Sequence, residues 1–72
     1  GGKPMTVRYY LGKLGQEQLM HTIHNTSFIP SKCDFVTLDD DDPTNYKVMY
    51  RTYLPFEDTY EIFMREAISE DF

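Results

Sequence analysis

Hydrophobic and polar residues alternate along two stretches of the chain, residues 6–11 and 46–53. Both stretches are rich in β-branched and aromatic residues, so each predicts a β-strand. In the second stretch the alternation places Tyr46, Val48 and Tyr50 on one side of the strand. Residues 33–38 form a shorter apolar segment that predicts a further strand, and residues 39–45 form a polar loop.

A helical period occurs in two other segments. Residues 16–25 contain good helix formers and place Leu19, Met20 and Ile23 on one stripe, which predicts a helix. Residues 55–69 predict a second helix, since proline suits a first helical turn and apolar residues follow at helical spacing. The apolar residues of that stripe are Phe56, Tyr60, Phe63, Met64 and Ala67.

These elements predict a small α+β domain with the order β-α-β-β-α. We expect strands 33–38 and 46–53 to form an antiparallel hairpin, and we expect both helices to pack on one face of a three-stranded sheet. Seventy-two residues allow one domain, assigned to residues 5–72. Residues 1–4, which precede Met5, are interpreted as a tag remnant.

Composition narrows the class of protein. Hydrophobic residues make up 40% of the chain, enough for a core, and no apolar run approaches the roughly 18 residues of a membrane span. We therefore expect a soluble, cytoplasmic protein. The lone Cys33 cannot form an internal disulfide, which favours a reducing compartment, and it is interpreted as a small buried strand residue without nucleophilic function.

Charge is distributed unevenly along the chain, which has a formal net charge of −5. Residues 1–33 carry four bases and one acid, a net of +3, whereas residues 34–72 carry three bases and eleven acids, a net of −8. Four consecutive aspartates at 39–42 repel one another within a Debye length of about 8 Å, and a turn needs only one of them. The run is therefore either a solvated acidic surface or a surface for a basic partner.

The predicted last helix carries acids at a similar density. Six acids from Glu57 to Asp71 would extend about 21 Å along a helix axis, or one charge per about 4 Å, close to the 3.4 Å charge spacing of one DNA strand. A short, acidic, tyrosine-rich chain with the run Asp39-Asp40-Asp41-Asp42 and an acid-rich end resembles the small DNA-mimic proteins that phages make against their hosts. The resemblance covers residues 34–72, whereas the basic first half departs from a uniformly acidic mimic.

The resemblance implies a non-catalytic inhibitor that fills the DNA cleft of a basic host protein of the HU type and blocks DNA binding. It also implies association with the bacterial nucleoid and a homodimer, with no cofactor, no direct nucleic-acid contact and no membrane contact. The partner-binding residues that it implies are Asp39, Asp40, Asp41, Asp42, Glu57, Asp58, Glu61, Glu66 and Glu70.

Two other binding functions remain open. Five residues of the strands at 6–11 and 46–53 would form a basic, aromatic sheet face that could stack single-stranded bases or form a dimer face. These residues are Arg8, Tyr10, Lys47, Arg51 and Tyr53. A protein-interaction module without charge mimicry would instead use Tyr50 and Tyr53.

Catalytic and metal sites are not predicted. On a helix, Glu17, His21 and His24 would share one side, as zinc ligands can, but no fourth ligand follows at a suitable spacing. The aspartate run lacks the central glycine of a calcium loop, and Tyr50 occupies the position of its bidentate glutamate. The chain has no Ser-His-Asp pattern and no glycine-rich phosphate loop, so we expect no enzyme activity.

Overall fold

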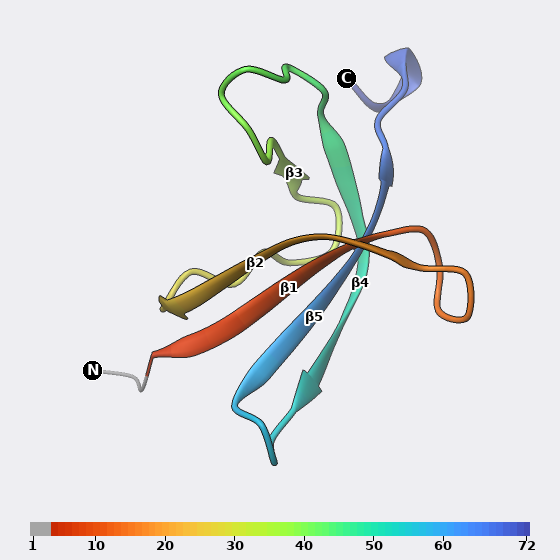
Figure 1. Cartoon of the computed structure of the whole chain (residues 1–72). Helices are drawn as coiled ribbons and strands as arrows, with labels where there is room; N and C mark the ends of the chain where they lie inside the picture. Colours follow the sequence, from red (N-terminus) through yellow and green to blue (C-terminus); the bar gives the residue numbers. More distant parts are fainter. Residues whose placement is uncertain (1–3) are drawn as a thin grey trace.

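Five β-strands form one mixed sheet in the computed structural model, which describes residues 4–72 (Figure 1). Their order across the sheet is β2-β1-β5-β4-β3. β1 and β5 are parallel, whereas the other neighbouring strands are antiparallel. The elements are β1 (Met5–Leu11), β2 (Gln18–Thr26), β3 (Phe35–Val36), β4 (Tyr46–Leu54), β5 (Thr59–Glu66) and a short 3₁₀ turn, η1 (Ser69–Asp71).

The predicted α+β fold with two helices on one face of a three-stranded sheet is wrong. β2 replaces the helix predicted at 16–25, and a hairpin turn followed by β5 replaces the helix predicted at 55–69. In β2, the β-branched residues Thr22, Ile23 and Thr26 favour an extended backbone. β5 pairs on both sides, with β1 and with β4, so its backbone hydrogen bonds go to two neighbouring strands.

The strand predictions fared better. β1 and β4 confirm the strands predicted at 6–11 and 46–53, and β3 pairs antiparallel with β4, as predicted for that hairpin. Only Phe35 and Val36 of the segment 33–38 are in strand conformation. Cys33 is exposed, with φ at +74° in the turn before β3, so the prediction of a buried strand cysteine is also wrong.

The hydrophobic core lies on one face of the sheet, called here the core face. Buried residues of the three central strands form its cluster, and Ile29, Val36 and Leu38 from the segment after β2 pack against them. The opposite face, called the open face, carries three stacked rings. Phe63 of β5 lies between Tyr10 and Tyr50, with ring centroids 5.3 and 4.8 Å away, and is 1% exposed. β5 is therefore buried on both faces. The buried members of the core cluster are Val7, Tyr9, Tyr46, Val48, Ile62 and Met64.

A β-bulge interrupts β4 between Val48 and Tyr50. Tyr50 therefore lies opposite Phe63, on the open face, and Arg51 lies opposite Ile62, on the core face. The strict alternation predicted through residues 46–53 fails at this point, because one extra residue reverses the faces of all residues that follow.

Two further predictions concern the start of the chain and membranes. Residues 1–3 of the predicted tag remnant lie outside the described residues, and Pro4, its last residue, is exposed. Within residues 4–72, the structure contains no helix with the length and hydropathy that a bilayer span requires.

The sheet and the predicted helix differ in which phenylalanine they bury. The helix stripe would bury both Phe56 and Phe63, whereas the sheet buries Phe63 and leaves Phe56 81% exposed. Phe63→Ala should therefore destabilise the fold by about 3–5 kcal/mol, and Phe56→Ala by less than about 0.5 kcal/mol. Urea unfolding followed by circular dichroism measures both. Equal losses for the two variants would contradict the sheet.

Candidate binding surface at one end of the sheet

Two acid-rich segments meet at the end of the sheet where β4 begins and β5 ends (Figure 1). The Ala67 amide donates to the Asn45 carbonyl oxygen at 2.9 Å, and Tyr46 pairs with Glu66 across the two strands. The rings of Phe35 and Phe72 stack with centroids 5.1 Å apart. We name this region, residues 38–47 and 65–72, the acidic end.

The acidic end accounts for the whole formal charge of the chain. It contains seven acids and two bases, Lys47 and Arg65, a net of −5, which equals the formal net charge of all 72 residues. The rest of the chain has five acids and five bases and is neutral. A charge concentrated in this way produces a local negative field, which a uniformly distributed charge would not.

Two of the four loop aspartates build the turn that presents the others. The Asp42 amide donates to the Asp39 carbonyl oxygen at 3.1 Å, and Asp39 Oδ1 accepts the Asp41 amide at 3.0 Å. Asp42 Oδ1 accepts the Thr44 hydroxyl at 2.6 Å and the Thr44 amide at 3.0 Å. These two bonds lower the pKa of Asp42, and the bond from the hydroxyl has the larger effect. The Asp42 carboxylate therefore stays charged. Asp40 is exposed at the tip of the turn with Asp41.

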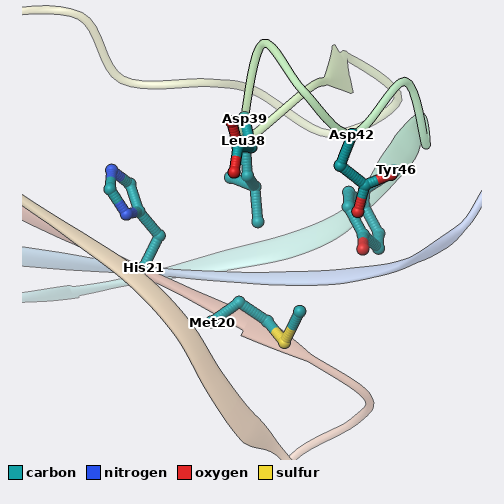
Figure 2. Close-up of a pocket in the computed structure, with 6 residues that line it drawn as sticks. All are labelled: Met20, His21, Leu38, Asp39, Asp42 and Tyr46. Atoms are coloured by element: carbon teal, nitrogen blue, oxygen red, sulfur yellow. The ribbon is translucent and has the colours of Figure 1, made fainter.

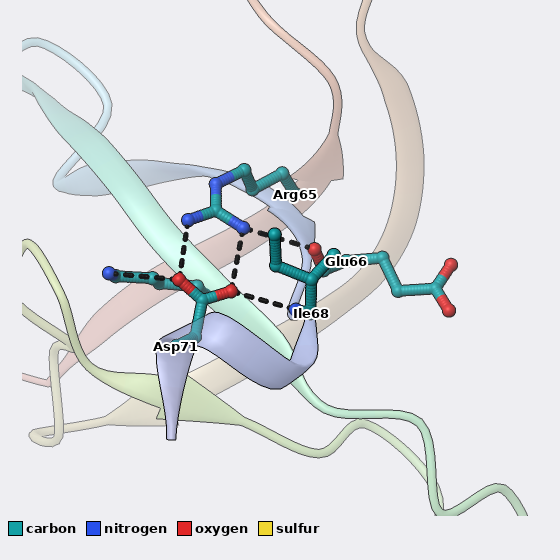
Figure 3. A network of polar contacts seen from close by, with 5 residues as sticks. Arg65, Glu66, Ile68 and Asp71 are labelled. Atoms are coloured by element: carbon teal, nitrogen blue, oxygen red, sulfur yellow. Dashed lines mark hydrogen bonds and ion pairs between the residues drawn. The ribbon is translucent and has the colours of Figure 1, made fainter.

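Asp71 holds the C-terminal segment against the open face (Figure 3). Its carboxylate accepts two bonds from Arg65, at 2.8 and 2.9 Å, and one from the Ile68 amide at 2.7 Å. Lys47 Nζ lies 3.3 Å from Asp71 Oδ1, and the Asp71 side chain is only 7% exposed. The Arg65 bonds contribute most to a pKa of Asp71 far below its usual range. This contact engages both bases of the acidic end.

The structure divides the nine predicted partner-binding residues into two groups. Six lie at the acidic end, and all six are exposed. The other three lie elsewhere, because β4 and β5 run away from that end to their shared turn. The predicted helical row of acids is therefore wrong. The six residues at the acidic end are Asp39, Asp40, Asp41, Asp42, Glu66 and Glu70.

The remaining three predicted residues make contacts within the fold. Glu57 lies in the turn between β4 and β5, about 25 Å from the acidic end at 3.3 Å per strand residue, and its carboxylate is 3.6 Å from Arg8. The Asp58 carbonyl oxygen, in the same turn, accepts the Thr6 amide at 3.1 Å. Glu61, inside β5, accepts the Tyr10 hydroxyl at 3.1 Å.

Sequence reasoning missed a pocket between the aspartate loop and β2 (Figure 2). It has a volume of about 220 Å³ and combines apolar, aromatic, imidazole and carboxylate groups. Because residues 16–25 were predicted as a helix, the sequence offered no reason to expect them opposite the aspartate loop. In the structure β2 lies there. The lining residues are Met20, His21, Leu38, Asp39, Asp42 and Tyr46.

The histidines do not form a metal site with Glu17. His21 pairs with Tyr9 on the core face, whereas His24 Nδ1 lies 3.3 Å from the hydroxyl of Thr6, on the open face. Glu17 accepts the Gly15 amide at 2.7 Å. Within residues 4–72, no three His, Cys, Asp or Glu side chains are grouped closely enough to hold a metal ion.

The predicted basic, aromatic sheet face is also divided. Arg8, Tyr10 and Lys47 lie on the open face, but the bulge places Arg51 and Tyr53 on the core face. Arg51 lies over the Tyr60 ring, 5.3 Å from its centroid, and donates to the Pro30 carbonyl oxygen at 3.4 Å. The five residues therefore do not form one surface for stacked bases.

The arrangement suits attraction of positive charge more than chemistry on a substrate. Exposed carboxylates at one end of a small protein act over about a Debye length, 8 Å at physiological salt, on any basic surface that approaches. Comparison with protein-family models, curated proteins and solved structures found no match to this chain.

Asp71 should make stability depend on pH. The pKa of Asp71 is lower in the folded state than its ordinary 3.8, so its carboxylate stabilises the fold above that pH and loses this effect as the pH falls. The Asp71→Asn variant should therefore unfold at a lower urea concentration than the native chain at pH 7. This gap between the two urea midpoints should be smaller at a pH of about 2.5. The neighbouring exposed Glu70→Gln should show no gap at either pH. An Asp71→Asn gap that is constant with pH would contradict this.

Proposed function

We propose that this chain is a non-catalytic acidic protein that occupies the basic DNA-binding cleft of another protein and excludes DNA from it. A HU-type nucleoid protein is the proposed partner, in keeping with the resemblance to phage DNA mimics. The observation that supports the proposal most is the concentration of the whole net charge of −5 at one end of the sheet.

The physical basis is competition for the same lysine and arginine side chains. A DNA-binding cleft gains much of its affinity by neutralising phosphates, and a cluster of exposed carboxylates offers it charges of the same sign. Asp40 and Asp41 are at the tip of a turn whose flanking residues fix its shape, so little ordering is needed on binding. Such contacts form quickly and weaken steeply with salt.

The position of the acidic carboxylates favours insertion of one end of the molecule into the cleft. The aspartate loop follows β3 on the core-face side, where Leu38 packs on the core, whereas η1 lies on the open face through Asp71. Carboxylates thus flank both sides of one narrow sheet end. A net-negative chain is repelled by nucleic acid itself, so we propose protein binding, and association with the nucleoid through that partner.

We further propose that two copies pair through β2. This strand is at the edge of the sheet and contains no lysine, arginine, acid or proline, the residues that usually block edge pairing. Its apolar residues Leu19, Met20 and Ile23 are 53%, 37% and 37% exposed. Antiparallel pairing of two β2 strands about a two-fold axis would satisfy their outer backbone groups and match a two-fold symmetric partner.

Competition with DNA tests the proposed function. The native chain should displace a labelled duplex from a HU-type protein at about 50 mM salt and fail to do so at about 500 mM. Asp40→Asn with Asp41→Asn should weaken binding to that protein about tenfold, because each exposed ion pair contributes up to about 1 kcal/mol. Isothermal titration at several salt concentrations measures both effects.

A matched double variant removes the same charge elsewhere. Glu57→Gln with Glu61→Gln changes the net charge equally, but both residues lie away from the acidic end and contact Arg8 and Tyr10. This control should bind the partner as the native chain does. Equal weakening by both double variants, or binding that persists at high salt, would reject docking through the acidic end.

The proposed dimer has its own test. Light scattering after size exclusion should give twice the 8.5 kDa mass of one chain, and Leu19→Lys should return it to 8.5 kDa, because a lysine on an edge strand blocks strand addition. Leu14→Lys, at a residue 69% exposed in the loop before β2, serves as the control and should leave the mass unchanged. A native mass of one chain contradicts the pairing.

A further inference from the structure

We propose that the pocket between the aspartate loop and β2 receives a single cationic side chain, arginine or lysine, from the basic partner. The identity of the partner rests on the proposed function, whereas the preference of the pocket for such a side chain does not. The pocket has a volume of about 220 Å³ and opens beside the exposed loop aspartates, where a basic surface would dock (Figure 2).

The Tyr46 hydroxyl provides the first argument. Tyr46 is only 8% exposed, and its hydroxyl points into the pocket toward Met20 (Figure 2). Among residues 4–72 it makes no side-chain hydrogen bond, and no buried side-chain nitrogen or oxygen lacks a partner, so this hydroxyl is the part of Tyr46 that the pocket leaves open to solvent. A phenol oxygen accepts a bond from an ammonium or guanidinium group, so such a head would satisfy it.

The two pocket carboxylates provide the second argument. Asp39 and Asp42 each accept bonds from the loop through Oδ1, which fixes the orientation of both carboxylates. In the described part of the chain, no donor bonds to Oδ2 of either residue. Among residues 4–72 no lysine or arginine lines the pocket, so within this part of the chain the two oriented negative charges have no cation beside them. Two carboxylates and a phenol are acceptors suited to a multivalent donor head.

Size and polarity provide the third argument. Nucleotides and drug-sized ligands need pockets of about 300–1,000 Å³, so 220 Å³ is closer to one long side chain. Met20 and Leu38 form apolar walls that suit the methylene stem of lysine or arginine, while the acids meet its head. A bare metal ion fits less well, since no group of three metal ligands is present within residues 4–72.

The probes are three short capped peptides, Gly-Arg-Gly, Gly-Lys-Gly and Gly-norleucine-Gly, titrated into the ¹⁵N-labelled native chain at low salt. The two cationic peptides should shift the amide signals of His21, Leu38 and Tyr46 in a saturable way. The norleucine peptide has a similar stem without charge and should not. Whichever cationic peptide binds more tightly identifies the preferred head group.

A conservative pair of variants separates the pocket from general attraction to the acidic end. Tyr46→Phe keeps the buried ring and removes only the hydroxyl, so peptide affinity should fall about tenfold, the loss of one charge-assisted bond. Tyr53→Phe, at a tyrosine 45% exposed and outside the pocket, should have no effect. Asp40→Asn with Asp41→Asn should leave peptide shifts at Tyr46 in place.

The outcomes distinguish the two proposals. Equal binding of the norleucine peptide, or unchanged affinity in a folded Tyr46→Phe variant, overturns the cationic pocket. DNA displacement by the native chain then still decides the proposed function on its own. Conversely, the cationic pocket is supported if peptide binding is saturable and the Tyr46→Phe variant binds more weakly. This conclusion holds even where no DNA is displaced from a HU-type protein.

Discussion

Burial of β5 on both faces is the constraint on which the rest of the fold depends. Ile62 and Met64 fill the core face, while Phe63 is covered on the other face by the rings of Tyr10 and Tyr50. A domain of this size buries only about 60% of its unfolded surface, so a strand that contributes apolar area in both directions supplies a large part of its stability. β1 and β4 flank it, and the outer strands depend on those two.

The bulge in β4 connects this core to the distribution of charge. One extra residue rotates Tyr50 onto Phe63 and directs Arg51 toward Tyr60 and the Pro30 carbonyl, so that base is used within the fold. Before the bulge, Lys47 remains on the open face beside Arg65, where Asp71 binds both. Both bases of the acidic end are thus engaged by Asp71, while Asp39, Asp40, Asp41, Asp42, Glu66 and Glu70 are exposed.

Sequence alone predicted β1 and the first part of β4. In these strands apolar and polar residues alternate, because only one face of the strand is in the core. The prediction failed for β5, because Tyr60, Phe63 and Met64 fit a helical stripe as well as a two-faced strand, and periodicity cannot separate the two. The aspartate loop was predictable from its composition. The pocket was not, because it requires the loop and Tyr46 to face β2, which the sequence predicted as a helix.

The parallel pairing of β1 with β5 has a consequence for how the chain reaches this structure. Thr6 pairs with Thr59, so the two central strands are separated by most of the sequence. Closing such a long loop costs entropy before any contact repays it, and contacts of this range slow folding. During synthesis, β1 and β2 are made long before β5, the other neighbour of β1. The nascent hairpin therefore exposes Val7 and Tyr9 until β5 has been synthesised.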